Sequence, residues 1–471
     1  MRMDSTSLPA SQRAFCHSRL FLLVVTSLFW LAVLVHAAAA ASIDLSFGEA
    51  GLATGQALPG KDAIGPAQKI GIDKRGRLVA MGNDSTGMMV LMRFTGQGEL
   101  DSTFGTSGRV YTTSFIRDRP IGEGRGLFVA RNGQALTTGT LGFGTLEPSS
   151  IYQSAFVSNI FANGALDTEF AFHGNRSVYI GDRNHSAGLR GEAIVRLAGG
   201  KIVVAGQAFH GRRRSAGFLA KLDAKGRHYD RNFVGSPSSR TKRIGIVEAR
   251  PGWPGQTDFT EILPFSKGRL VATGSSNGNF LAARFRSNGT LDTAYGTKGI
   301  RTVDVDGVAT CGCSFARASV LDKHGRLLVA GYVTHRVANG NEARLAVIRL
   351  TRVGKLDMTF GSGGISELPL PYGSEPSSPG IPDIFLTTGI AVQHDGKIVI
   401  SGQYNRKFSL VRLKSNGSLD GSFFDHGLFS DWIEGSYGAA WDVLVDTFGR
   451  IVASGGKIDG TFALIRIEQG R

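Results

Sequence analysis

Few residues in this 471-residue sequence have the types and spacing that catalysis requires. The run Gly274-Ser-Ser-Asn-Gly278 has the spacing of a serine nucleophile motif. That motif works on a sharp turn between a strand and a helix, whereas we expect a strand hairpin here. Asp304-Val-Asp306-Gly begins like a calcium loop but lacks its later acidic ligands. The sequence contains no phosphate-binding loop, zinc-protease helix or dinucleotide fingerprint, so we expect neither an enzyme nor a cofactor.

The cysteines offer little more. Cys311 and Cys313 are separated by a single glycine, and the third cysteine, Cys16, lies near the N-terminus. Cys311 and Cys313 could form a local, strained bridge with each other, or they could be two small residues in a loop. A zinc site needs two further ligands nearby, and no Cys or His follows at a suitable spacing, so we expect no metal.

Binding chemistry has a stronger basis, because basic residues are abundant. Lys and Arg number 53 against 38 Asp and Glu, which gives a formal net charge of +15. Arginine grips carboxylate, sulfate and phosphate groups through paired hydrogen bonds. The candidate binding residues are Arg212, Arg213 and Arg214, with Trp253 as an aromatic surface. We expect an anionic partner: a polysaccharide, a lipid headgroup or a surface protein. Further basic clusters are Arg117 with Arg119, Arg183 with Arg190, Arg240 with Lys242 and Arg243, and Arg406 with Lys407.

These candidates must be positioned by a repeat that runs through the sequence. A phrase of the form Leu-Asp-x-x-Phe-Gly-x-x-Gly recurs in varying quality around seven aspartates: Asp44, Asp101, Asp167, Asp230, Asp292, Asp357 and Asp420. A second phrase, Gly-(Arg/Lys)-apolar-apolar-small-small-Gly, begins at Gly76, Gly133, Gly200, Gly268, Gly325, Gly396 and Gly449. A third alternates apolar residues before a basic one, as in VLMRF at Val90–Phe94. Three phrases with a common spacing indicate a repeat architecture.

Each repeat predicts four short strands and no helix. In the first full repeat the strands are expected at 68–73, 77–82, 89–94 and 109–113, with turn residues between them. A lone four-stranded sheet buries too little apolar surface to be stable, so the sheets must stack. A radial stack of such sheets is a β-propeller, in which only short sheet edges remain.

The phase of the repeat predicts how the ring closes. After residue 41 the chain opens with a segment that resembles a fourth strand (44–54), and it ends with three strands over 441–467. The N-terminal strand therefore completes the last sheet, whereas an open solenoid would need capping repeats. We predict an all-β, seven-bladed β-propeller of four-stranded blades that forms a single domain over residues 42–471.

The N-terminus predicts export. Residues 1–41 combine a basic leader, an uncharged apolar run from Leu20 to Val35 and a run of alanines, which is typical of a signal peptide cleaved before Ser42. The alternative is an uncleaved anchor over 20–41, a length that could span a bilayer. We expect a monomer that is periplasmic, extracellular or at the cell surface, or else anchored through its N-terminus. Export disfavours nucleic acid as a partner.

The phrases resemble the delta-60 repeat, also called the DUF5122 β-propeller repeat, of secreted and surface proteins of bacteria. HDGKIVISG at His394–Gly402 and FSLVRLKSNGSLDGSF at Phe408–Phe423 are most similar to the family pattern. The resemblance covers about residues 43–467, and it departs in the second unit, where Asn159 stands at the basic position. It implies a propeller and export, and it implies no activity.

Two functions follow from these observations. The repeated Asp and basic residues are expected to form an ion pair or an Asp turn within each blade, so function should lie where the repeat is broken. Variable loops on a rigid scaffold are a common location of binding residues. The first hypothesis is a non-catalytic binding or scaffold protein with a basic loop face, and the second is a lyase or hydrolase in the propeller funnel. Asymmetric carboxylates in the loops would favour the enzyme, and the loops instead contain arginine.

Overall fold

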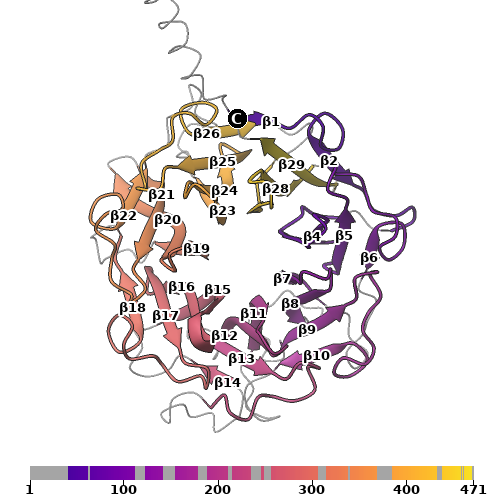
Figure 1. The fold of residues 1–471 in the computed structure, drawn as a ribbon, viewed down its shortest axis with the longest axis horizontal. Coiled ribbons are helices and arrows are strands. Elements are labelled where there is room, and N and C mark those ends of the chain that lie inside the picture. Colours follow the sequence, from indigo (N-terminus) through magenta and orange to yellow (C-terminus); the bar gives the residue numbers. More distant parts are fainter. Residues whose placement is uncertain are drawn as a thin grey trace, which may run out of the picture.

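The fold is a ring of seven sheets around a central channel (Figure 1). The computed structural model describes residues 41–468, except 62–63, 112–121, 142–153, 179–187, 210–214, 235–245, 249–255, 306–313, 338–339, 369–384, 432–437, 458 and 460. Within these residues the elements are β-strands and one 3-10 turn, η1 (Ser266–Gly268). No helix in this part of the chain is long and apolar enough to cross a membrane, and the predicted signal peptide or anchor lies almost wholly outside it.

Each blade has four antiparallel strands in chain order, with the first strand at the channel. Blade 1 contains β3 (Lys69–Ile72), β4 (Leu78–Asn83), β5 (Met89–Phe94) and β6 (Arg109–Tyr111). Blade 2 contains β7 (Gly124–Val129), β8 (Ala135–Leu141), β9 (Ser154–Ile160) and β10 (Asn175–Val178). Blade 3 contains β11 (Gly188–Arg196), β12 (Ile202–Phe209), β13 (Ser215–Leu222) and β14 (Ile246–Glu248). The strands of blade 1 agree with the predicted ones to within two residues at each end.

The remaining blades repeat this arrangement. Blade 4 contains β15 (Thr257–Phe265), β16 (Arg269–Ser276), β17 (Asn279–Phe285) and β18 (Ile300–Val303). Blade 5 contains β19 (Phe315–Leu321), β20 (Leu327–Val337), β21 (Gly340–Leu350) and β22 (Ile365–Leu368). Blade 6 contains β23 (Leu386–Val392), β24 (Ile398–Tyr404), β25 (Lys407–Leu413) and β26 (Leu428–Asp431). Blade 7 contains β27 (Asp442–Val445), β28 (Ile451–Gly456) and β29 (Phe462–Glu468).

The predicted closure is confirmed. The outer edge of β29 pairs with β1 (Ser42–Ile43) and β2 (Leu52–Gly55), so the two ends of the described chain complete blade 7 together. The pairing is reinforced by Arg466, whose Nε donates to Asp44 Oδ2 at 2.6 Å. The seven-bladed, all-β prediction is therefore correct.

An ion pair holds the outer half of six of the seven blades, and it explains the first repeated phrase. In blade 4, Arg284 Nε donates to Asp292 Oδ2 at 2.9 Å, and both side chains are buried. The guanidinium also lies 4.7 Å from the ring centre of Tyr295, the residue at the Phe position of the phrase. The same basic–Asp pair recurs as Arg93–Asp101, Lys221–Asp230, Arg349–Asp357, Arg412–Asp420 and Arg466–Asp44.

The same basic residues also join neighbouring blades. Arg284 Nη1 donates to the Arg352 carbonyl of blade 5, and Arg349 Nη1 donates to the Ser415 carbonyl of blade 6, both at 2.5 Å. Blade 2 lacks the arginine, and Arg196 of blade 3 donates instead to Asn159 Oδ1 at 3.2 Å. Seven apolar clusters fill the spaces between adjacent blades. The ring is thus held by apolar packing and by one polar clamp per blade.

The innermost strands of blades 2 to 6 contain a β-bulge that the second phrase makes possible. In β15 the register shifts between Phe259 and Glu261, so one extra residue faces β16. A Cβ added at Gly274, the last glycine of the phrase, would overlap the carbonyl oxygen of Asp258. Equivalent overlaps occur at Gly82, Gly139, Gly206, Gly331, Gly402 and Gly455. The glycine therefore leaves room for the bulged backbone, and the bulge sets which residues face the channel.

Removal of residues 42–54 should destabilise the whole ring. The deletion removes β1, most of β2 and the carboxylate that pairs with Arg466, and it leaves the edge of β29 exposed. We expect a protein that unfolds or oligomerises, measured by thermal melting and by size exclusion with light scattering. A truncated monomer that melts within a couple of degrees of the intact protein would contradict this account of closure.

Acid should unfold the protein through the clamps. Burial alone raises the pKa of Asp101, but hydrogen bonds from Thr103 and the charge of Arg93 outweigh it and hold that pKa below its usual range. The pKa values of Asp44, Asp230, Asp357 and Asp420 are lowered in the same way. Because these folded pKa values lie below the unfolded value of about 3.9, the stabilisation is present at higher pH and is lost as pH falls below about 4. Thermal melting against pH should show a steep fall in Tm there, and a flat profile would contradict it.

Candidate functional site

The predicted binding residues lie outside the described part of the chain. This holds for Arg212, Arg213, Arg214 and Trp253, and for Cys311 and Cys313, so their predicted roles remain predictions. The serine motif is described, and it forms the expected hairpin between β16 and β17. The Ser275 hydroxyl accepts a hydrogen bond from the Ala316 backbone N–H at 3.0 Å, which gives it a structural role between blades.

The repeat is broken at one position that lines the channel. This position lies seven residues before the glycine that opens the second phrase, and it is occupied by Lys69, Gly126, Ala193, Glu261, Ala318, Gly389 and Asp442. Four of these residues are small, and three carry charges. The small residues leave a cavity of about 210 Å³, and the charged side chains enter it from blades 1, 4 and 7. This is the asymmetry that a functional site requires, and it lies in strands instead of loops.

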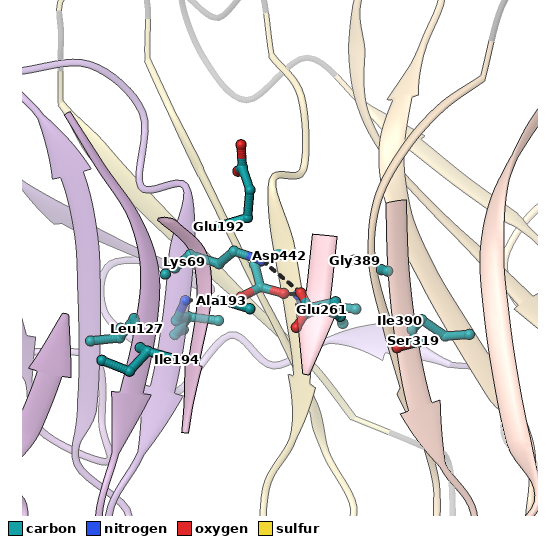
Figure 2. Close-up of a pocket in the computed structure, with 14 residues that line it drawn as sticks. Lys69, Leu127, Glu192, Ala193, Ile194, Glu261, Ser319, Gly389, Ile390 and Asp442 are labelled. Carbon is teal, nitrogen blue, oxygen red and sulfur yellow. Dashed lines mark hydrogen bonds and ion pairs between the residues drawn. The ribbon is translucent and has the colours of Figure 1, made fainter. Parts of the chain in front are cut away.

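Figure 2 shows that Lys69, Glu261 and Asp442 converge in the cavity. Lys69 Nζ donates to Glu261 Oε1 at 3.1 Å, a contact that joins blades 1 and 4 across the channel. Asp442 accepts the Ile70 N–H on Oδ2 at 3.1 Å and the Val443 N–H on Oδ1 at 2.9 Å. The positive charge of Lys69 therefore acts on the carboxylates of both Glu261 and Asp442.

Burial and charge act in opposite directions on these groups. Burial lowers the pKa of Lys69, but the negative charges of Glu261 and Asp442 outweigh it and hold that pKa above its usual range. Burial raises the pKa of Asp442, and the nearby Lys69 charge only partly offsets the shift. Lys69 therefore stays charged at neutral pH, while Asp442 is protonated more readily than an ordinary aspartate.

A second charged group lies toward the face that carries the connections between blades. Figure 2 shows Glu192 extending away from the other three charged side chains. Its carboxylate faces Arg125 at 3.6 Å and Arg190 at 3.9 Å, and Arg125 also pairs with Glu123 at 2.7 Å. Burial raises the pKa of Glu192 despite these arginines. Arg190, predicted as part of a basic loop cluster, thus lies on β11 beside the channel.

The arrangement can donate and accept several hydrogen bonds within a small volume. The described residues contain no group of three or more His, Cys, Asp or Glu side chains placed to hold a metal ion. The Lys69 ammonium lies close to the carboxylates and neutralises part of their negative charge. The site is therefore suited to a polar ligand that offers hydroxyl groups or a charge.

Sequence reasoning missed these residues, although the sequence holds a signal for them. When the repeats are aligned on the second phrase, the position seven residues earlier changes from small to charged in three blades only. That comparison identifies Lys69, Glu261 and Asp442 together, and the preceding position identifies Glu192, Arg125 and Arg317.

Comparison with known proteins finds a family to which part of the repeat is similar. The family described as a domain of unknown function (DUF5122) β-propeller matches residues 268–295, 325–360 and 393–423. In blades 4, 5 and 6 these segments contain the second repeated phrase and the first one, whose aspartate pairs with a buried basic residue. A search of curated protein sequences found no match.

Solved structures with similar folds include several enzymes. A streptogramin B lyase aligns with 12% identity and a TM-score of 0.46, over 88% of this chain and 97% of the lyase. An α-L-arabinanase from Penicillium chrysogenum aligns with 13% identity and a TM-score of 0.44, over 76% and 97%. An ulvan lyase aligns with 11% identity and a TM-score of 0.39, over 88% and 94%. At these values the likeness carries no argument about the activity of this chain.

Removal of the Lys69 charge should destabilise the protein in a pH-dependent manner. Lys69→Met leaves Glu261 and Asp442 without their cation, which should cost about 1–2 kcal/mol at pH 7 because the groups are only partly buried. The pKa of Asp442, already raised by burial, then rises further because the Lys69 charge no longer offsets the burial. The penalty is therefore present at neutral pH and is relieved as Asp442 becomes protonated at lower pH.

The measurement is the difference in Tm between the variant and the parent protein from pH 7 to acid. Lys267→Met, in the turn between β15 and β16, is the matched control and should show almost no difference. A Lys69→Met penalty that is absent, or that does not change with pH, would mean that the cluster is not electrostatically coupled.

Proposed function

We propose that this chain, a β-propeller repeat protein of the DUF5122 family, is an exported, non-catalytic binding protein. Its ligand is taken on the face that carries the connections between blades, at the mouth of the central channel. The sequence supports export through residues 1–41, which have the composition of a signal peptide.

One observation carries the proposal. The clamp residues recur around the ring with their partners, whereas the channel position holds charged side chains in three blades and small ones in four. A structural role would be expected to repeat with the fold. Lys69, Glu261 and Asp442 meet only because the ring brings blades 1, 4 and 7 around one cavity, so their convergence is not a requirement of the repeat.

Binding explains the hydrogen bonding better than catalysis does. Asp442 accepts backbone N–H groups on both oxygens, and Glu261 accepts from Lys69. A carboxylate fixed by such contacts is suited to hold a ligand in place. The basic loop residues, with Arg212, Arg213 and Arg214 foremost, support an anionic partner because they are uncompensated in the sequence.

An enzyme remains a second candidate, since one observation favours it. The pKa values of Asp442 and Glu192 are both raised by burial, and both residues line the same cavity. A carboxyl with a raised pKa can act as a general acid at neutral pH. Product analysis of every polymer that binds separates the two candidates: binding without turnover supports the first, and a shortened polymer supports the second.

The loop arginines should carry most of the salt-dependent affinity. We expect the purified mature protein to bind acidic polysaccharides or anionic vesicles on an array, and to release them as the salt concentration rises, because added salt screens the attraction. Changing Arg212, Arg213 and Arg214 together to Ser should weaken binding with a stability change below about 0.5 kcal/mol, since exposed loop positions tolerate substitution.

The matched control changes Lys74, Arg75 and Lys323 to Ser, which removes the same charge from exposed turns at the other end of the innermost strands. This control should bind like the parent protein. Equal affinity of the two triple variants, or affinity that is indifferent to salt, would contradict electrostatic recognition by the loop face.

A further inference from the structure

We infer that the channel mouth binds one sugar unit of an acidic polysaccharide, with an aromatic side over blade 5 and a hydrogen-bonding floor in the cavity. This inference deepens the proposed function and rests on it. It names the class of ligand and the described residues that recognise it.

The aromatic side consists of two rings at the start of blade 5. Phe315 opens β19 and is paired in register with Tyr332 of β20, with ring centres 5.3 Å apart. Phe315 is 36% exposed, an unusual degree for a phenylalanine beside a channel in a protein that buries most of its others. Arg317 lies 5.7 Å from both ring centres and donates to the Tyr332 hydroxyl at 3.3 Å. The rings are therefore held in place by contacts with the Arg317 guanidinium.

The aromatic pair is not part of the cavity wall, but Phe315 lies on a strand that contributes to this wall. Ala318 and Ser319 line the cavity and follow Phe315 on the same strand. Three strand residues span about 10 Å, so a ligand that touches Phe315 can also reach the cavity. Exposed apolar side chains continue around this side, with Leu386 at the start of blade 6 and Trp441 beside blade 7, 39% and 36% exposed.

The opposite side of the mouth is charged. Arg125 of blade 2 and Arg190 and Glu192 of blade 3 form the ion pairs described above. The floor adds Lys69, Glu261 and Asp442, which offer an ammonium donor and carboxylate acceptors. The mouth thus combines aromatic and apolar side chains with Arg317 over blades 5 to 7, and it carries ion pairs over blades 2 and 3.

The surface of a sugar ring is divided in the same way, into an apolar part and a polar part. Its C–H groups form an apolar face that packs on an aromatic ring, and its hydroxyls require donors and acceptors around the rim. Converging polar groups beside an apolar wall are the usual form of a small-ligand site, and here the cavity supplies the polar groups and the aromatic pair the apolar wall. A lipid headgroup offers no comparable apolar face at its polar end, so the aromatic pair favours a saccharide among the anionic partners.

The test uses the full mature protein with oligogalacturonate as an acidic saccharide, dextran as a neutral one and phosphatidylglycerol vesicles as an anionic surface. The parent protein should bind oligogalacturonate. Phe315→Ala should weaken that binding about tenfold, because truncation of an aromatic contact at the centre of a site costs more than about 1 kcal/mol. Phe448→Ala is the matched control: Phe448 is 80% exposed in the turn between β27 and β28, at the other end of the innermost strands, and its loss should leave binding unchanged.

The other outcomes separate this inference from the proposed function. Oligogalacturonate binding that Phe315→Ala leaves intact would overturn the channel-mouth site and leave the anionic partner in place. Binding to the vesicles alone would overturn the saccharide inference and retain the anionic partner. Binding to dextran with the same affinity as to oligogalacturonate would overturn the acidic character. Failure to bind any probe would contradict both proposals.

Discussion

The buried pair between a basic residue and an aspartate is the interaction on which the ring depends. Arg284 shows its full geometry: one nitrogen donates to Asp292, another to a carbonyl of the next blade, and the planar group packs on Tyr295. A buried guanidinium is costly unless its charge and its donors are satisfied. In blades 1, 3, 4, 5 and 7 that cost is met with residues from two blades, so each of these blades is complete only when its neighbour is in place.

This constraint separates the residues that hold the fold from those that are free to vary. The clamp, the apolar clusters and the glycine opposite each bulge recur around the ring, because every blade must make the same contacts. The channel position has no such requirement, since small and charged residues both fit there. Lys69 and Glu261 join blades 1 and 4 across the channel by a contact that the propeller itself does not need. Because the fold does not require this contact, we propose that the ligand binds beside it in the channel.

Much of the fold was predictable from the sequence, and the site was not. The phrases around Asp292 and Gly268 report local contacts, so their period and phase predict seven blades and the closure by residues 42–54. The channel cluster joins residues as far apart as Lys69 and Asp442, and ring closure alone brings them together. The bulge adds an unpaired residue, which breaks the alternation that would identify the channel-facing side chains. The sequence does show that the loops vary in length, and this variation pointed to the loops, and not to the channel, as the location of the binding residues.

The most direct test of this account is a double-mutant cycle on Arg284 and Asp292, measured by denaturant unfolding. Arg284→Ala, Asp292→Ala and the double variant give the coupling energy of the buried pair. The account predicts about 2 kcal/mol or more, because Asp292→Ala leaves the Arg284 charge buried without its carboxylate. Arg284→Ala leaves Asp292 only the more exposed Arg269, 2.8 Å away. The same cycle on the exposed pair of Glu169 and Arg227, 3.4 Å apart, should give a coupling near zero. Equal and negligible coupling in both cycles would contradict the claim that the repeated ion pair holds the ring.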